Sequence, residues 1–490
     1  MVRGDLDREI TSLACDSRQA EPGCLFFCIK GCLADGHDYA EAAALKGAAA
    51  VVCSREVRLP EGSDAAVLLA DDVRRTMGAM AAAFYGCPAE KLTTIGVTGT
   101  KGKTTTTYMI RAILEEAGIR TGLIGTVEIH TGKEILKSEY TTPDSIQLQK
   151  YLHDMAESGC RAAVIEVSSQ AMKLDRTYPI YFDYGVFTNI EEDHISPAEH
   201  PDFADYAACK AKLFQCCRTG LVNGDEPNLE LITGGAACRL ETFGLGEGND
   251  MRAESLCPMR MPGALGSEFR VRRGDAFDGN VTLPMPGSFN CSNALAAISV
   301  CGQMGISSET AAKALRRLSV PGRQEMFALD ASRLVLVDYA HNGTGLRGLL
   351  MSLRAYSPAR LTCVFGCGGG RDPGRRRKMG EAAAKYADRI IITSDNPRNE
   401  APQSIIRDIM KEVSKFETPF RVIEDRRQAI EEAVRSCRAG EITVICGKGH
   451  EDYQILGNRK IHFDDREMVR ASIEKVKNEQ NYNCRNSGGH

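Results

Sequence analysis

Short apolar runs alternate with amphipathic stretches along most of this chain. In the first segment the apolar runs lie at 25–29, 49–53 and 66–69. A second segment carries continuous apolar runs at 162–167 and 184–188, and each is followed by polar residues. Continuous apolar strands that alternate with helices are typical of mostly parallel sheets, in which functional side chains gather at the strand ends.

The last third of the chain repeats this alternation. Apolar runs predict strands at 334–337, 361–365, 390–393 and 442–446, separated by helical stretches such as 429–438. This pattern predicts a second, doubly wound α/β unit with a parallel sheet.

The chain of 490 residues is long enough for about three domains. We predict an α/β protein with domains at 1–90, 91–323 and 324–478. Within the second domain, residues 251–286 alternate polar and apolar positions, which indicates an antiparallel excursion. Residues 479–490 have no apolar periodicity and are predicted to be a disordered tail.

The most informative pattern lies at 93–106, TTIGVTGTKGKTTT. A β-branched strand enters a loop with three glycines, and an amphipathic helix follows that is predicted to stop at Gly118. Backbone N–H groups of such a loop can close around phosphate oxygens, and the helix N-terminus adds partial positive charge. Lys103 is predicted to reach the outer phosphates and Thr104 to ligate Mg²⁺. The first glycine, Gly96, comes one position earlier than in the strict phosphate-loop pattern.

Composition narrows the class of protein. With 43% hydrophobic and 26% charged residues the chain can bury a large core, and its net charge of −4 gives no electrostatic signature of nucleic-acid binding. No apolar stretch approaches the ~20 residues that span a bilayer, and the N-terminus lacks an apolar signal region. The 19 cysteines are scattered without zinc-type spacing. We therefore expect a cytoplasmic protein whose cysteines are reduced.

Polar residues follow the two strands of the second segment. Glu166 comes at the end of the first, and Asn189, Asp193 and His194 follow the second. Carboxyl ends of parallel strands share one sheet edge, so these groups are expected beside the phosphate loop. Glu166 and His194 are therefore predicted to ligate Mg²⁺ that bridges a nucleotide and an acceptor.

A series of motifs extends this picture over nearly the whole chain. They are GVTGTKGKTTT, EVSS, FTNIEEDH, PGSFNCSNALAA, VPGR, DYAH, FGCGGGRD and SDNPRNE, with DSR, PGCLFFCIKG and DGHDY near the N-terminus. In this order the motifs resemble the Mur ligase family. The resemblance implies a small α/β UDP-binding domain, a central ATPase domain of the phosphate-loop type and a C-terminal Rossmann-like domain that brings the incoming amino acid.

The resemblance also implies an activity. It is an ATP-dependent amide-bond ligase that adds meso-2,6-diaminopimelate to the D-Glu of UDP-N-acetylmuramoyl-L-Ala-D-Glu through an acyl phosphate, in peptidoglycan precursor synthesis. The implied cofactors are ATP and Mg²⁺. The implied partners are these small molecules, with no nucleic acid and no membrane, and a monomer is expected.

Site residues follow from the matching motifs. Catalytic roles are implied for Lys103, Lys210, His194 and Arg323, where Lys210 occupies the position of a carbamylated lysine. ATP contacts are implied for Gly99, Thr100, Lys101, Gly102, Lys103, Thr104, Thr105, Asn290, Asn293, Arg323, Asp338, Tyr339 and His341. Contacts to the UDP-linked dipeptide are implied for Ser17, Thr141, Thr142, Ser168, Arg176 and Lys210. Metal ligands are implied to be Thr104, Glu166, His194 and Lys210.

The third amino acid is predicted to be diaminopimelate rather than L-lysine. Its distal carboxylate needs a fork of donors and its ammonium needs an acceptor. Arg398 supplies the fork, and it lies in a D-N-P-R motif that resembles the motif of family members that use diaminopimelate. Glu451 supplies the acceptor. The predicted contacts are Asp395, Asn396, Pro397, Arg398, Gly447 and Glu451.

Other functions stay open at this point. The same ligase could use L-lysine, and a folylpolyglutamate-synthetase-like ligase shares the general plan. A phosphate-loop kinase or GTPase would release its nucleotide product without needing an amine. A non-catalytic paralogue would bind the precursor without turnover. The chain departs from the usual motifs at Gln170, Leu174 and Asn342.

Overall fold

The computed structural model describes residues 2–5, 7–31, 34–193, 195–196, 199–274 and 277–487. These residues form two compact units. One comprises Met1–Met251 with Ala296–Ile306, and the other comprises Arg252–Leu295 with Ser307–His490. The first unit includes both the first predicted domain and most of the second, so the boundaries within it remain predictions.

The N-terminal part of the first unit is a small α/β layer with the strand order β1-β5-β4-β3-β2. Strand β1 runs antiparallel to β5, and the other pairs are parallel. Alternate strand residues bury the two faces, which explains the continuous apolar runs in the sequence. The elements are β1 (Val2–Arg3), β2 (Ser12–Ala14), β3 (Cys24–Phe27), η1 (Gly36–Tyr39), α1 (Ala40–Leu45), β4 (Ala50–Cys53), β5 (Ala66–Leu69), α2 (Val73–Phe84) and η2 (Pro88–Lys91).

The central sheet of the first unit has the strand order β13-β12-β11-β6-β10-β7-β8-β9. Strand β6 lies between β11 and β10, parallel to both, so the two apolar runs singled out in the sequence flank the strand that enters the phosphate loop. The strands are β6 (Thr93–Thr98), β7 (Thr121–Ile124), β8 (Glu128–His130), β9 (Ile135–Lys137), β10 (Ala162–Glu166), β11 (Phe182–Phe187), β12 (Cys217–Asn223) and β13 (Arg239–Gly244).

Helices cover this central sheet. Helix α3 ends at Glu116, and Gly118 follows with φ of +75°, which confirms the predicted stop. The helices are α3 (Lys103–Glu116), α4 (Ser145–Glu157), α5 (Ser169–Lys173), α6 (Phe203–Ala211), η3 (Lys212–Gln215) and α7 (Leu229–Thr233). Helix α8 (Ser288–Gln303) belongs to the first unit only from Ala296 on, and its first residues belong to the second unit.

The second unit confirms the predicted antiparallel excursion. Strands β14 (Met251–Met261), β15 (Ala264–Arg273) and β16 (Phe277–Leu283) pair antiparallel in sequence order, with an irregular register between Glu254 and Cys257. Helix α9 (Ser308–Leu315) follows, capped by the Ser307 hydroxyl.

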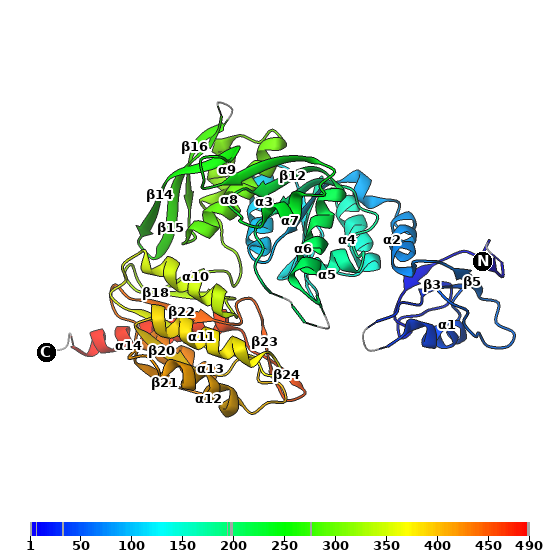
Figure 1. Cartoon of the computed structure of the whole chain (residues 1–490). Coiled ribbons are helices and arrows are strands. Elements are labelled where there is room, and N and C mark those ends of the chain that lie inside the picture. The colour runs from blue at the N-terminus through cyan, green and yellow to red at the C-terminus, as the bar shows by residue number, and fades with distance from the viewer. Residues whose placement is uncertain are drawn as a thin grey trace. The chain divides into compact units, whose positions relative to one another are not determined.

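The C-terminal part of the second unit is the predicted doubly wound sheet, with the strand order β17-β18-β22-β19-β20-β21. Odd and even strand positions bury opposite faces. Leu334 and Leu336 pack with α10, α11 and α12, whereas Val335 and Val337 pack with α13 and α14. Figure 1 shows these helices around the sheet, in yellow to red.

The elements of this part are β17 (Glu325–Ala328), β18 (Leu334–Asp338), α10 (Gly343–Arg354), β19 (Leu361–Phe365), α11 (Pro373–Tyr386), β20 (Arg389–Ile392), α12 (Pro402–Val413), β21 (Phe420–Val422), α13 (Arg426–Arg435), β22 (Ile442–Cys446), β23 (Tyr453–Leu456), β24 (Arg459–His462) and α14 (Asp465–Ser487).

The prediction of a disordered tail is wrong for residues 479–487. They continue helix α14, whose residues Val469, Ile473 and Val476 are buried in the core with α13. A helix nucleated by such packing extends cooperatively into polar sequence, which a periodicity argument overlooks. Residues 488–490 lie outside the described part of the chain.

Two further findings concern the described residues only. All cysteines among them for which a side chain is described are free thiols. No helix among them has the length and apolar character that a bilayer crossing needs.

Candidate active site

The phosphate loop lies between β6 and α3 at the centre of the parallel sheet. Gly99 has φ of +147°, and a Cβ there would come 1.9 Å from the Thr188 hydroxyl oxygen, so only glycine fits. Gly102 has φ of +84° and precedes α3 without a side-chain cap. The partial positive charge at the start of α3 thus faces the loop and attracts a phosphate group. Lys103 folds back over the loop and donates to the Gly99 carbonyl oxygen at 2.8 Å.

Residues that follow β11 hold this loop in place. The Asn189 amide accepts from the backbone N–H of Lys101 at 2.9 Å and donates to its carbonyl oxygen at 3.1 Å. The Thr188 hydroxyl donates to the same carbonyl oxygen at 2.6 Å. The Lys101 ammonium pairs with Glu191 at 2.5 Å. A loop fixed by this many bonds is preorganised for an anion.

Glu166 lies at the same sheet edge. It ends β10, is in register with Val97 of β6, and is 1% exposed. Its Oε1 accepts the backbone N–H of Thr126 and its Oε2 accepts the Thr126 hydroxyl, both at 2.9 Å. Mg²⁺ prefers hard oxygen ligands, and the Glu166 carboxylate and the buried Thr104 hydroxyl are of this kind. The residues present therefore fit that ion.

Lys210 points from α6 into the same loop. It is 1% exposed, and its Nζ donates to the Gly99 carbonyl oxygen at 2.9 Å. Lys103 donates to the same oxygen at 2.8 Å, so two lysine amines converge on one acceptor. Burial, and then the charge of Lys103, lower the pKa of Lys210 well below its ordinary value. This shift favours the neutral, nucleophilic form of the Lys210 amine, which is the form that reacts with carbon dioxide.

Four residues predicted to contact the dipeptide lie near Glu166 and are connected by hydrogen bonds. The Thr142 hydroxyl donates to the Glu166 carbonyl oxygen at 2.6 Å and accepts the Ser168 backbone N–H at 3.1 Å. The Arg176 guanidinium donates to the Thr142 carbonyl oxygen at 2.8 Å. The hydroxyls of Thr141 and Thr126 are 3.0 Å apart. The structure thus brings together four residues that span 36 positions of sequence, from Thr141 to Arg176.

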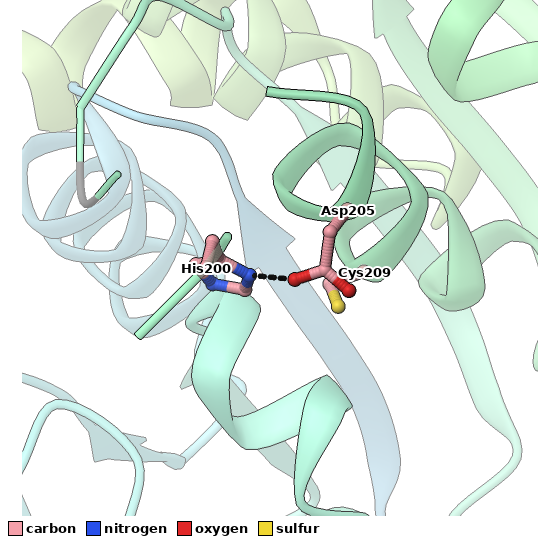
Figure 2. Close-up of side chains that lie close together, drawn as sticks. All are labelled: His200, Asp205 and Cys209. Atoms are coloured by element: carbon pink, nitrogen blue, oxygen red, sulfur yellow. Dashed lines mark hydrogen bonds and ion pairs between the residues drawn. The ribbon is translucent and has the colours of Figure 1, made fainter. Parts of the chain in front are cut away.

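His200, Asp205 and Cys209 form a compact group beside α5 (Figure 2). His200 Nδ1 lies 2.6 Å from Asp205 Oδ2, its Nε2 lies 3.0 Å from the Ser169 hydroxyl, and the Lys173 ammonium lies 2.8 Å from the same Asp205 oxygen. A cation at this oxygen would face the Lys173 charge, and burial raises the pKa of the Cys209 thiol. The group therefore acts as a hydrogen-bonded tie between α5 and α6 rather than as a metal site.

His194, the other predicted metal ligand, lies outside the described residues. Residues 197 and 198 also lie outside the described part of the chain.

Ser17 follows β2 in the N-terminal layer. Its carbonyl oxygen accepts the Lys46 ammonium at 2.8 Å, and Arg18 beside it pairs with Asp16 at 2.6 Å. The DSR motif is thus a tight turn at the carboxyl end of a strand, where ligand sites of such sheets lie.

In the second unit the predicted nucleotide contacts form an aromatic cluster. The Arg323 guanidinium lies 4.5 Å from the centre of the Tyr339 ring, and the His341 and His450 rings lie 4.6 and 4.8 Å from that ring. Burial and the nearby Arg323 lower the pKa of His450 to about 2, so its imidazole is neutral. Burial raises the pKa of Asp338. Flat rings beside a guanidinium can stack on a base or sugar.

The asparagines of the GSFNCSN motif belong to the second unit too. Asn290 donates to the carbonyl oxygen of Pro286 and to the Gln324 side chain, both at 2.8 Å. Asn293 donates to Asn290 at 3.3 Å. Both are buried, so these bonds fix the start of α8.

The predicted diaminopimelate residues also converge in the second unit. Glu451 Oε2 accepts from the Asn396 amide and from the Lys448 ammonium, both at 2.9 Å. Arg398 donates to the Gly369 carbonyl oxygen at 2.9 Å and has φ of +53°. Gly447 is required because a Cβ there would lie 2.6 Å from Asp395. Glu451 Oε2 is thus already bonded inside the protein, and a ligand ammonium would have to meet Oε1.

Sequence reasoning overlooked several of these residues. Thr126, His200 and Lys448 each bond to a predicted site residue or to its neighbour, yet none carries a motif signal of its own. Lys448 is completely buried, which is exceptional for lysine and would have marked it had burial been known.

Family comparisons agree with the geometry. Models of the Mur ligase family's catalytic domain, the Mur ligase middle domain and the Mur ligase glutamate ligase domain match residues 9–85, 97–301 and 322–449. The chain belongs to the Mur ligase family. The family's three-domain architecture therefore applies to it, with mixed α/β layers and parallel sheets.

Relatives of known name cover the whole chain. A UDP-N-acetylmuramoyl-L-alanyl-D-glutamate--2,6-diaminopimelate ligase 1 of Clostridium acetobutylicum is 40% identical over 97% of both chains. The corresponding ligase of Thermosynechococcus vestitus is 40% identical over 96% of this chain and 94% of its own. A solved structure of a ligase with this name is 30% identical, with a TM-score of 0.69 over 96% of this chain and 97% of that one. MurF of Acinetobacter baumannii, 17% identical with a TM-score of 0.63 over 95% and 94%, shares the fold.

Proposed function

We propose that this Mur ligase adds meso-2,6-diaminopimelate to the D-Glu of UDP-N-acetylmuramoyl-L-Ala-D-Glu at the expense of ATP. The observation that carries the proposal is the site itself, where Lys103, Lys210 and Glu166 line one sheet edge at a phosphate loop. Full-length similarity to ligases with this printed name supports the choice of substrates.

The proposed domains follow the same division of labour. Residues 1–90 hold the UDP moiety, with Ser17 in the turn after β2. Residues 91–323 hold ATP and the dipeptide, and residues 324–478 hold the amino acid.

The reaction proceeds through an acyl phosphate. A carboxylate oxygen of the D-Glu side chain attacks the γ-phosphorus of ATP, an O–P bond forms, and ADP leaves. The amine of the third amino acid then attacks the acyl carbon, the C–N bond forms, phosphate leaves, and the amine proton passes to solvent. Lys103 and Arg323 are proposed to stabilise the spreading phosphoryl charge.

Mg²⁺, when bound, neutralises phosphate charge. Glu166 and Thr104 are proposed to hold it, with His194 as a further ligand. Lys210 reacts with carbon dioxide through its neutral amine. An N–C bond forms, one C=O electron pair moves to oxygen, and a proton is released, so that the neutral amine becomes an anionic carbamate that suits a cation.

Amino-acid specificity rests on Arg398 and Glu451. Arg398 offers a planar fork to the distal carboxylate, and Glu451 Oε1 faces the ammonium. Lysine lacks that carboxylate and would leave the remaining donors of Arg398 without a carboxylate partner, which such sites penalise strongly. We propose further that the protein acts as a cytoplasmic monomer on small molecules.

The test is ADP release with purified UDP-N-acetylmuramoyl-L-Ala-D-Glu. Diaminopimelate should stimulate release and yield the tripeptide product, and L-lysine should do so far less. Release that needs no amine would favour a kinase or GTPase, and turnover of folate with glutamate would favour a folylpolyglutamate synthetase. No release under any condition would favour a non-catalytic paralogue.

A further inference from the structure

Thr126 is the residue to which both oxygens of the Glu166 carboxylate are bonded. Its backbone N–H bonds Oε1 and its hydroxyl bonds Oε2, each at 2.9 Å. Two bonds from one residue fix both the position and the rotation of a carboxylate that is 1% exposed. These two hydrogen bonds use one lone pair on each Glu166 oxygen, and the remaining lone pairs are held in a fixed direction.

The residue before Thr126 makes the close approach possible. A Cβ on Gly125 would lie 2.3 Å from Glu166 Oε1 and 3.0 Å from its carboxyl carbon. Gly125 therefore leaves room for the Glu166 carboxylate, and Thr126 binds it. Neither residue lies in the motifs on which the family resemblance rested.

The direction of the hydrogen bonds follows from a count of protons. The Thr126 hydroxyl has one proton, and it donates that proton to Glu166 Oε2. The Thr141 hydroxyl lies 3.0 Å from the Thr126 hydroxyl, and in this contact Thr141 must be the donor. Thr141, Thr126 and Glu166 thus form a directed chain from the proposed dipeptide contact to the proposed metal ligand.

We infer that Thr126 is a positioning residue that orients Glu166 for a divalent cation and couples it to Thr141. The inference rests on the proposed function, because that function assigns the cation to Glu166 and the dipeptide to Thr141. Hydrogen bonds to a ligating carboxylate typically change metal affinity 10- to 100-fold. Hydrogen bonds in a chain also polarise one another, so loss of the Thr141 donor should weaken the hydrogen bond from Thr126 to Glu166.

The experiment measures Mn²⁺ binding to the full chain by electron paramagnetic resonance, with a saturating non-hydrolysable ATP analogue and without dipeptide or amino acid. Thr126→Val keeps the shape and the N–H but removes the hydroxyl, and it should weaken Mn²⁺ binding at least about 10-fold. Thr126→Ser restores the hydroxyl and should bind within about threefold of the wild type. Thr141→Val should weaken binding about threefold, by cooperativity alone.

Two further variants make the result specific. Thr131→Val is the control, because Thr131 is a threonine five positions along whose hydroxyl donates to the Glu134 carbonyl oxygen rather than to Glu166. It should leave Mn²⁺ affinity unchanged. Gly125→Ala, which inserts a Cβ against the carboxylate, should weaken binding even if Thr126→Val does not fold.

The outcomes distinguish a failure of the proposed function from a failure of the role inferred for Thr126. Wild type without any protein-dependent Mn²⁺ site would contradict the proposed function. A wild-type site whose affinity is the same in Thr126→Val, Thr126→Ser and Gly125→Ala would overturn the role of Thr126 alone. Unchanged affinity in Thr141→Val would remove the coupling to the dipeptide contact.

Discussion

Lys210 gives the sharpest prediction, because the structure shows two lysine amines on one acceptor. Both Nζ atoms lie within 2.9 Å of the Gly99 carbonyl oxygen, so they are at most about 5.8 Å apart. Two full charges at that separation repel each other by about 3 kcal/mol at an effective dielectric constant of 20. Burial, and then this repulsion from Lys103, lower the pKa of Lys210 and favour its neutral form.

A lowered amine pKa in that position favours carbamylation, because the neutral amine is the nucleophile. Incubation of the enzyme with ¹³C-bicarbonate should give a carbamate carbon signal that is absent in Lys210→Ala. Removal of dissolved carbon dioxide should lower ADP release, and bicarbonate should restore it. Lys210→Ala should lose at least about 100-fold in kcat, the upper end for a lost metal-orienting group. Small carboxylic acids should restore part of this loss.

Lys210→Arg serves as a control for charge. Arginine is always charged and cannot form the carbamate, so this variant should be as inactive as the alanine variant. Full activity of Lys210→Ala, or of enzyme proved to be unmodified, would refute the reasoning.

Three further predictions concern other residues of the site. Lys103→Ala should keep the fold but lose about 10²- to 10³-fold in kcat, as for other preorganised donors, and near-normal turnover of a well-folded variant would refute its role. Wild type should prefer diaminopimelate to L-lysine in kcat/KM by at least about 100-fold, and Arg398→Ala should abolish most of that preference; a variant that loses nothing with diaminopimelate would contradict the assignment. Burial lowers the pKa of His450 from 6.5 to about 2 in the folded protein, so the unfolded chain binds the proton first and stability should fall as pH drops below about 6.5. His450→Gln should therefore show a smaller loss of Tm between pH 7 and pH 5, and an equal loss in both proteins would count against a buried neutral imidazole.

Local patterns predicted the parts of the fold that depend on local physics. The phosphate loop was recognisable because strand, glycines, lysine and helix follow one another within 14 residues, at 93–106. Glu166 could be assigned to the same sheet edge because parallel strands end at one side. The two faces of the C-terminal sheet follow from continuous apolar runs, which only a doubly covered sheet can bury.

Contacts between distant segments were beyond such patterns. Lys210 and Gly99 are 111 positions apart, and Thr126 and Glu166 are 40 apart. Nothing near Thr126 marks it, because a threonine after a glycine has many ordinary roles. Helix α14 extends beyond residue 478, where the sequence predicted a disordered tail. Packing against α13, rather than its own polar sequence, stabilises this helix.

The central claim is that an amide bond forms through an acyl phosphate at this phosphate loop. The most direct measurement uses UDP-N-acetylmuramoyl-L-Ala-D-Glu with ¹⁸O in the side-chain carboxylate of D-Glu, together with ATP and diaminopimelate. The account predicts that one ¹⁸O atom appears in each phosphate released, because the labelled oxygen attacks the γ-phosphorus and departs with it. Phosphate that carries no ¹⁸O while the tripeptide product accumulates would contradict it.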